Sequence, residues 1–531
     1  MFREHRAPVS TATEAITTRI TIDTRSLAAF RILAGLLLIA DVLLRARRFT
    51  DHYTGAGFVP AELARSVGHD GAFSLFWLTD DPAGVAILFA LHLLVGILLL
   101  VGYRTRMMTI LAFVFVASLD IRNPLVISYA DWLFRLLLFW AIFLPLGERW
   151  SIDAVYRRRW PRRSVAGLAS AMILAQMVFM YLVNGLLKTS GETWRSGEAA
   201  VLVFGLHDTT YLLGDSLRSV PELVAAGGFA WFILLLLSPL LLVTTGRRRL
   251  VLILLIGAGH LAFAVTVRIG AFPYVGVLGL LAFIQPSMWA DIGWLTDRLG
   301  FVAMYQRLRE FGTSIAELCP YPTFNRPSLH RTMALVGSFV LWSVVLSLVL
   351  LGALLVPQAG MLLDPGDDAH DRLERAIDDQ PVAAAIYDVH QRIGIEQPSW
   401  NIFAPEPRST DRYYVLAAQT VDGSWIDLRT GETVTLERPF DRLHRQHDTY
   451  RDRFFMTRLT QTDRFHGVAA AYLNHHCEGA SAELTSISLI EVRETVTPET
   501  IDMPVDRPRY SHLVATIGCG EHEPEPFELD G

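Results

Sequence analysis

Long apolar runs separated by short polar loops dominate the first two-thirds of this chain. Nine of them approach the length of about 20 residues that an α-helix needs to cross a bilayer. They lie at 27–44, 84–102, 106–120, 125–146, 165–187, 223–244, 249–267, 271–289 and 333–356. Two other segments, 60–78 and 199–212, mix aromatic, polar and apolar residues, which is typical of helices at a membrane interface. The pattern predicts an all-α polytopic transmembrane bundle of about nine spans.

After the last apolar run the pattern becomes that of a small soluble domain. The runs Tyr413–Leu416 and Trp425–Leu428, on either side of Asp422-Gly423, predict a β-hairpin with its turn at Asp422-Gly423. Residues 484–492 and 512–517 predict further strands, and 463–476 a helix. We therefore divide the chain into an N-terminal segment (1–26), a transmembrane domain (27–357) and an α+β C-terminal domain (358–531).

Composition and charge support this division. Hydrophobic residues make up 52% of the chain, and the mean hydropathy is +0.34, which exceeds that of an average soluble enzyme. Residues 1–357 carry a net charge of +9, whereas residues 358–531 carry −15 within the overall −6. No HExxH, CxxC, P-loop or GxGxxG motif occurs, so the sequence predicts no metal site. Basic stripes with interleaved aromatic residues are also missing, which argues against a nucleic-acid partner.

Arginines in short loops predict the orientation in the cell membrane. The loop 148–163 holds six arginines and the segment 247–249 holds three. These clusters are two spans apart, so both lie on one side, which the positive-inside rule assigns to the cytoplasm. The N-terminus is then cytoplasmic and the C-terminal domain is outside. Three arginines after the first span, Arg45, Arg47 and Arg48, run against this assignment. No small-residue cleavage site follows that span, so we expect it to be retained.

Lys188 is the only lysine among 47 basic residues. It ends the fifth predicted span on the outer side, where a basic side chain commonly extends to the interface. Arginine serves that purpose equally well and is used everywhere else in this chain. Lysine differs because it can lose its proton near neutral pH and act as a base. Both interpretations, an interfacial cation and a functional amine, remain open from the residues alone.

Other polar groups in the predicted spans are candidates because burial in lipid is costly. Asp131 and Arg135 are four residues apart on one helix face and predict a structural ion pair. His260 lies midway along the seventh span, either as a hydrogen-bonding group between helices or as a pocket residue. In the outer domain, Cys477 and Cys519 are candidates for a disulfide if the compartment is oxidising.

Several of these residues fall in motifs that together resemble one family. The motifs are Arg31-Ile-Leu-Ala-Gly35, Tyr53–Pro60, Gly102-Tyr-Arg104-Thr105, Arg122-Asn123-Pro124 with Asp131 and Arg135, Phe143–Gly147, Trp150–Asp153, Asn184-Gly185 through Lys188 to Trp194 and Gly197, Gly259-His260 to Phe272, and Trp400–Pro407. In this order they resemble the HTTM domain shared with vitamin K-dependent gamma-carboxylase, in its prokaryotic branch.

The resemblance implies a lysine base and a quinone co-substrate. Lys188 would help deprotonate a reduced quinone of the vitamin K or menaquinone type, which reacts with O₂. The strong base so formed would remove a proton from a glutamyl γ-carbon of a protein or peptide, and the carbanion would capture CO₂. The resemblance implies His260, Asn123, Arg104, Asn184 and Trp194 as pocket residues.

Two departures from the family pattern limit the resemblance. The animal carboxylase has a histidine shortly after the asparagine region that matches Asn123, whereas residues 121–135 here contain none. The outer domain is also much smaller than the carboxylase's lumenal portion. The alternative is therefore a non-catalytic membrane protein that binds a quinone or lipid, or assists assembly, on the same fold.

Overall fold

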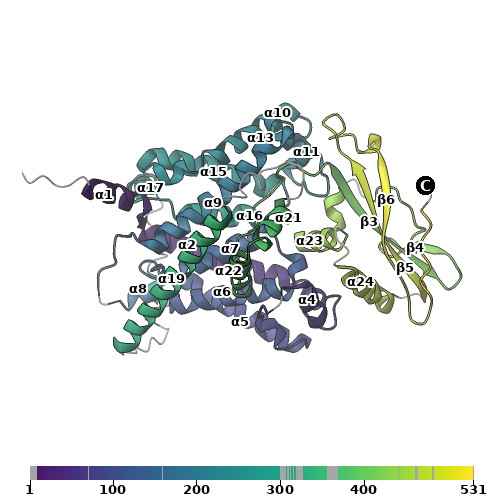
Figure 1. Ribbon diagram of the computed structural model, residues 1–531, viewed down its shortest axis with the longest axis horizontal. Coiled ribbons are helices and arrows are strands. Elements are labelled where there is room, and N and C mark those ends of the chain that lie inside the picture. The colour runs from purple at the N-terminus through teal and green to yellow at the C-terminus, as the bar shows by residue number, and fades with distance from the viewer. Residues whose placement is uncertain are drawn as a thin grey trace, which may run out of the picture.

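The computed structural model describes residues 9–529, except 70, 158, 299, 301–305, 308–309, 311, 315, 318–326, 356–368, 440–441, 461–464 and 481–482. The chain forms a mostly helical body with a small sheet at one end (Figure 1). Helix α1 and the sheet lie at opposite ends of the long axis. The predicted domain boundary at 357–358 and Cys319 lie outside the described residues.

The helical body contains one helix, or a pair, at each predicted apolar run. Its helices are α1 (Val9–Ile20), α2 (Thr24–Ala46), α3 (Phe49–Tyr53), α4 (Ala61–Val67), α5 (Pro82–Val101), α6 (Thr105–Arg122), α7 (Tyr129–Ala141), α8 (Ile152–Val155), α9 (Leu168–Ser190), α10 (Glu192–Ser196), α11 (Ala199–Gly205), α12 (Leu213–Leu217), α13 (Pro221–Leu236), α14 (Leu240–Val243), α15 (Gly246–Thr266), α16 (Phe272–Leu281), α17 (Pro286–Arg298) and α19 (Pro327–Leu355). A short ladder pairs β1 (Ile22–Asp23) with β2 (Ser164–Val165).

Five of the described helices are long and apolar enough to cross a membrane, namely α2, α5, α9, α15 and α19. A sixth span results if the bent pair α16 and α17 is counted as one. Helix α7 has only 13 residues and α13 has 16, which is less than a simple crossing requires. The predicted count of nine spans therefore stays a prediction, while a bundle of several apolar helices is established.

Small residues bring some of these helices into close contact. A Cβ atom at Gly35 in α2 would lie 2.7 Å from the Cα of Leu100 in α5. A Cβ at Gly276 in α16 would lie 2.3 Å from the His260 ring of α15. Because any side chain at either position would displace its neighbour, glycine permits the packing at both places.

Buried ion pairs join α2, α6 and α7 to the C-terminal domain. Arg45 contacts Asp41 at 2.9 Å, Asp120 at 2.7 Å and Asp131 at 2.8 Å. Asp131 also binds Arg451 of α23 (Tyr450–Leu459) at 2.7 Å. Arg45 is 2% exposed, so it serves as an internal ion, which explains why it did not follow the loop-charge rule.

The predicted ion pair between Asp131 and Arg135 is wrong, because each side chain pairs with other residues. Arg135 instead contacts Glu396, and lies 3.6 Å from Asp120. Helical spacing placed both side chains on one face, but stronger partners from other elements reach each of them. Two of the competing groups, Glu396 and Arg451, are more than 200 residues away along the chain, and no local spacing reveals them.

The C-terminal domain has the predicted α+β character. It contains α21 (Ala369–Asp378), α22 (Pro381–Ile393), β3 (Thr410–Thr420), β4 (Trp425–Asp427), α23 (Tyr450–Leu459), α24 (His466–Gly479), β5 (Leu484–Thr495) and β6 (Arg509–Gly518). The strands form one antiparallel sheet in the order β4-β3-β5-β6. The hairpin and parts of all four strands were predicted from runs of β-prone residues, and Gly423 has the positive φ of 85° that its turn requires.

A disulfide joins Cys477 of α24 to Cys519 just after β6. It closes a loop of 42 residues and so fastens the helix to the edge strand. We expect a maleimide to label one cysteine of the unreduced, denatured chain and all three after reduction, because the chain has three cysteines.

The double replacement Cys477→Ser/Cys519→Ser is expected to lower the free energy of unfolding by about 2–4 kcal/mol, since the cross-link limits the unfolded chain. Cys319→Ser is the matched control for labelling and should remove the only thiol reactive before reduction. Three labels on the unreduced chain would contradict the disulfide.

Candidate functional site

Helix α9 places three polar side chains along one face near its C-terminal end. Tyr181, Asn184 and Lys188 are three and four residues apart, so they lie one above another on the helix. All three are buried, with Lys188 only 2% exposed. The lysine therefore does not extend to the surface of the protein, as a purely interfacial cation would.

The amine of Lys188 is held by main-chain carbonyls and an aromatic ring. Its Nζ donates to the Ile402 oxygen at 2.5 Å and to the Phe403 oxygen at 3.2 Å. It also lies 4.3 Å from the centre of the Trp194 ring, a distance that allows a cation–π interaction. The Trp194 Nε1 donates to the Phe403 oxygen at 2.7 Å. Among the described residues, no acidic side chain forms an ion pair with Lys188.

The segment that supplies these carbonyls is fastened by Asn184. Its Nδ2 donates to the Trp400 oxygen at 2.7 Å and to the Ile402 oxygen at 3.0 Å. Trp400 and Phe403 have φ values of 53° and 51°, a left-handed conformation that is uncommon for bulky residues. This backbone directs successive carbonyls toward α9, so the segment after α22 completes the surroundings of the lysine.

Lys188 borders an apolar cavity of about 310 Å³. The walls come from α9 to α13, α15, the loop before α16, the start of α16 and the segment 402–403, and include Trp231, Phe263 and Phe272. Lys188 is the only charged side chain among the described lining residues. An amine facing a predominantly apolar, aromatic-walled space is suited to a flat hydrophobic ligand.

His260 lies one layer behind this cavity. The Tyr181 hydroxyl and the His260 Nε2 are 2.7 Å apart, and the histidine ring also contacts Trp231 and Phe272. Tyr181 lines the cavity whereas His260 does not. The structure thus connects the histidine to the cavity through the tyrosine hydroxyl.

Two predicted pocket residues are elsewhere. Arg104 lies in the turn between α5 and α6, where its main-chain N–H donates to Asp153 at 2.8 Å. Asn123 follows α6, and its Nδ2 donates to the His52 carbonyl at 3.0 Å. Neither residue borders the Lys188 cavity, so both stabilise the fold and neither belongs to the site.

Sequence reasoning missed the carbonyls of Ile402 and Phe403, because main-chain groups leave no signal in residue identity. Tyr181 was detectable, since it is seven residues before Lys188 on the same helix face. Among the described residues, no three His, Cys, Asp or Glu side chains are grouped so that they could hold a metal ion.

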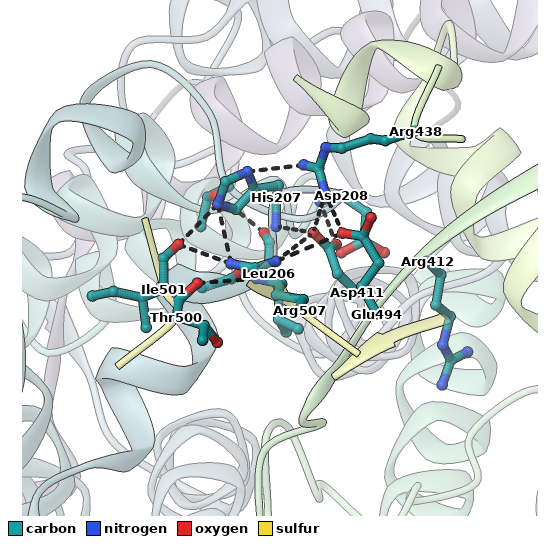
Figure 2. Close-up of polar contacts among 12 residues, drawn as sticks. Leu206, His207, Asp208, Asp411, Arg412, Arg438, Glu494, Thr500, Ile501 and Arg507 are labelled. Atoms are coloured by element: carbon teal, nitrogen blue, oxygen red, sulfur yellow. Dashed lines mark hydrogen bonds and ion pairs between the residues drawn. The ribbon is translucent and has the colours of Figure 1, made fainter. Parts of the chain in front are cut away.

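A second buried cluster joins the loop after α11 to the sheet (Figure 2). Main-chain N–H groups of His207 and Asp208 donate to Asp411 of β3 at 3.0 and 2.9 Å. Arg507 contacts Asp411 at 3.2 Å, and Arg438 contacts Glu494 of β5. This cluster anchors the sheet on the membrane domain and so helps to position the segment that reaches Lys188.

Both nitrogens of the His207 ring make hydrogen bonds only when the ring is neutral. Its Nε2 donates to the Ile501 carbonyl at 2.9 Å, so its Nδ1 accepts from Arg438 at 2.9 Å. Burial, together with Arg218, lowers the pKa of His207 to about 3. This folded-state pKa is below the unfolded value of 6.5. The contribution of neutral His207 to the free energy of unfolding is therefore fully present above pH 6.5 and is lost as the pH falls toward 3.

We expect His207→Gln to flatten this pH dependence. Glutamine can donate to Ile501 and accept from Arg438, but it does not titrate. Between pH 7 and pH 5 the wild type should lose about 2 kcal/mol more stability than the variant, measured by chemical unfolding of the full chain.

Titration of Asp411 does not account for the expected difference in pH-dependent stability between the wild type and His207→Gln. Burial and Asp208 raise its pKa to about 7, so its protonation changes stability in the opposite direction over this interval. Equal pH dependence in the wild type and His207→Gln would contradict the assignment.

The fold and site define a multi-pass membrane protein with a lysine-bearing cavity and a small C-terminal sheet region. The family model of the HTTM domain matches residues 20–289, just over half of the chain. The chain belongs to this family, which includes vitamin K-dependent carboxylase-like members. The match covers α2 to α16 and ends before α19 and the C-terminal domain. Comparisons with curated proteins and with solved structures find no match.

Proposed function

We propose that this protein is a membrane enzyme that resembles vitamin K-dependent gamma-glutamyl carboxylase and uses Lys188 as a base on a reduced quinone. The observation that carries the proposal is the burial of the chain's only lysine against an apolar cavity, without an acidic partner in the described part of the chain. A basic residue that served only as an interfacial cation would have its charged end in water.

The surroundings of Lys188 suit both states of a general base. The apolar cavity favours the neutral amine, which is the form that accepts a proton. After proton transfer, the carbonyls of Ile402 and Phe403 and the face of Trp194 stabilise the ammonium. The step we assign to Lys188 is transfer of one proton from a quinol hydroxyl to Nζ, which leaves a quinolate anion and an ammonium.

The cavity fits the ring system of a quinone. Its volume of about 310 Å³ is at the lower end of the range of about 300–1,000 Å³ for ligand sites. Leu223 of α13 both lines the cavity and is 62% exposed, which offers a lateral route for an apolar tail into the bilayer. In the family, the bound quinol with O₂ supplies the strong base for carboxylation by CO₂, and the acceptor here would be a glutamyl side chain.

The arrangement of the ends supports the proposed orientation in the cell membrane. Helix α8 lies within the arginine-rich loop 148–163. It and helix α1 lie at the end of the molecule opposite the sheet (Figure 1). A cytoplasmic N-terminus then places the C-terminal domain outside, where an oxidising compartment would preserve the disulfide. Protease protection of residues 369–529 in sealed, right-side-out membranes would overturn this orientation.

The function is tested with the full chain reconstituted in lipid. Quinol oxidation or epoxide formation is measured with menaquinol and O₂, and incorporation of labelled CO₂ into glutamyl peptides is measured separately. Quinol consumption that depends on Lys188 supports the enzyme. Specific quinone binding with neither activity favours the alternative, a non-catalytic quinone-binding protein of the same fold.

A further inference from the structure

A second cavity of about 230 Å³ lies beside the first, where the C-terminal domain meets the membrane domain. The two cavities share four lining residues, Ile269, Phe272, Ile402 and Phe403. The carbonyl-bearing segment that binds Lys188 is therefore the partition between them. Unlike the apolar first cavity, the second is lined by three arginines, four hydroxyl side chains and the amide of Asn401.

The three arginines are Arg408, Arg412 and Arg453, and the described lining contains no aspartate or glutamate. Arg408 is neutralised because it binds Asp208 at 2.5 Å. Arg412 and Arg453 are more than nine-tenths buried, with exposures of 8% and 9%. No carboxylate among the described residues lies within hydrogen-bonding distance of either guanidinium.

Arg453 of α23 is held by neutral acceptors only. It donates to the Thr209 hydroxyl and to the Arg268 carbonyl, each at 2.9 Å. Its Nε has no partner in the described structure. Burial lowers the pKa of Arg453 to about 10, so the guanidinium stays protonated at neutral pH.

Arg412 of β3 is also incompletely satisfied. Its Nε and one terminal nitrogen have no hydrogen-bond partner among the described residues. The nearest carboxylate, Glu491, is 3.7 Å from its Nε and binds Arg493 more closely, at 2.6 Å. Figure 2 shows the Arg412 side chain directed away from the ion pairs around Asp411.

We propose that this cavity binds the carboxylate of an organic substrate, with Arg412 and Arg453 as its ligands. A buried guanidinium with unfilled hydrogen-bond donors is costly, and its planar donors match a carboxylate with two parallel hydrogen bonds. The apolar partition of Ile402 and Phe403 suits the aliphatic carbons that follow the carboxylate. The inference deepens the proposed function, because it places an acidic substrate beside the Lys188 cavity. It rests on the proposed function for the reaction that follows binding.

Binding is tested by calorimetry on the full chain in lipid nanodiscs without any quinol. Butyrate is the probe and butyramide is its neutral analogue of the same shape. We expect butyrate to bind, butyramide not to bind, and Arg412→Gln to weaken butyrate at least about tenfold. Arg65→Gln is the matched control, because Arg65 is an exposed arginine over Trp77, and butyrate should bind this variant as it binds the wild type.

A second measurement on the wild type removes any dependence on how a variant folds. Butyrate should protect Arg412 and Arg453 from the arginine reagent phenylglyoxal, as read by peptide mass spectrometry. The proposal is overturned if butyrate does not bind, if Arg412→Gln binds it equally, or if bicarbonate or phosphate binds more tightly. Butyrate binding without quinol oxidation would count against the proposed function alone.

Discussion

Replacing Lys188 by arginine is expected to reduce quinol oxidation by about 10²–10⁴-fold, the usual contribution of a general base. Arginine keeps a positive charge and hydrogen-bond donors, but it cannot give up its proton at physiological pH. The larger guanidinium must also fit between the Ile402 and Phe403 carbonyls and the Trp194 ring. The rate is measured under saturating menaquinol in proteoliposomes.

Two control variants separate chemistry from folding in this experiment. Arg65→Lys exchanges the same two residue types at an exposed cation–π contact with Trp77 and should leave the rate unchanged. Lys188→Ala should be inactive and partly rescued by small primary amines that enter the cavity. Full activity of a folded Lys188→Arg protein would disprove the role of the lysine as a base.

Replacing Asp131 by asparagine is expected to destabilise the protein by about 3–5 kcal/mol, the typical cost of breaking a buried ion pair. The Asp131 carboxylate lies between Arg45 at 2.8 Å and Arg451 at 2.7 Å, and a neutral amide leaves both guanidiniums undercompensated. Because Arg451 belongs to α23, the loss should also loosen the C-terminal domain. Chemical unfolding of the full chain measures the change.

The matched control is Asp388→Asn. Asp388 pairs with Arg392 at 2.9 Å but is 36% exposed, so solvent screening limits its contribution to about 0–1 kcal/mol. Double replacement of Asp131 and Arg451 should cost less than the sum of the single replacements, since it removes the unpaired charge. A loss at Asp131 no larger than at Asp388 would contradict a role for the network in stability.

The local patterns that were predicted well are those set by neighbouring residues. The β-prone runs at 413–416 and 425–428 predicted the hairpin, and β3 and β4 cover both runs except Leu428. Apolar runs likewise predicted a helix at each of nine positions. The hydrophobic pattern did not decide which of them cross the bilayer, because α7 and α13 are short helices of the bundle.

The candidate site was predicted only in part. Lys188, Asn184 and Trp194 meet around the segment 400–403, in agreement with the family motif that joins them along the chain. Arg104 and Asn123 belong to equally recognisable motifs but stabilise turns instead. A motif alone did not distinguish residues that border the cavity from residues that hold the helices in place.

The sequence by itself determined that the chain is a bundle of apolar helices with an acidic α+β domain, and that one lysine stands among 46 arginines. Only the tertiary structure decided what surrounds that lysine. Its hydrogen-bond acceptors are main-chain carbonyls more than 200 residues away, and the partners of Asp131 come from α2 and α23. Side-chain periodicity encodes which face of an element is buried, whereas the groups that meet across that face depend on how distant segments pack.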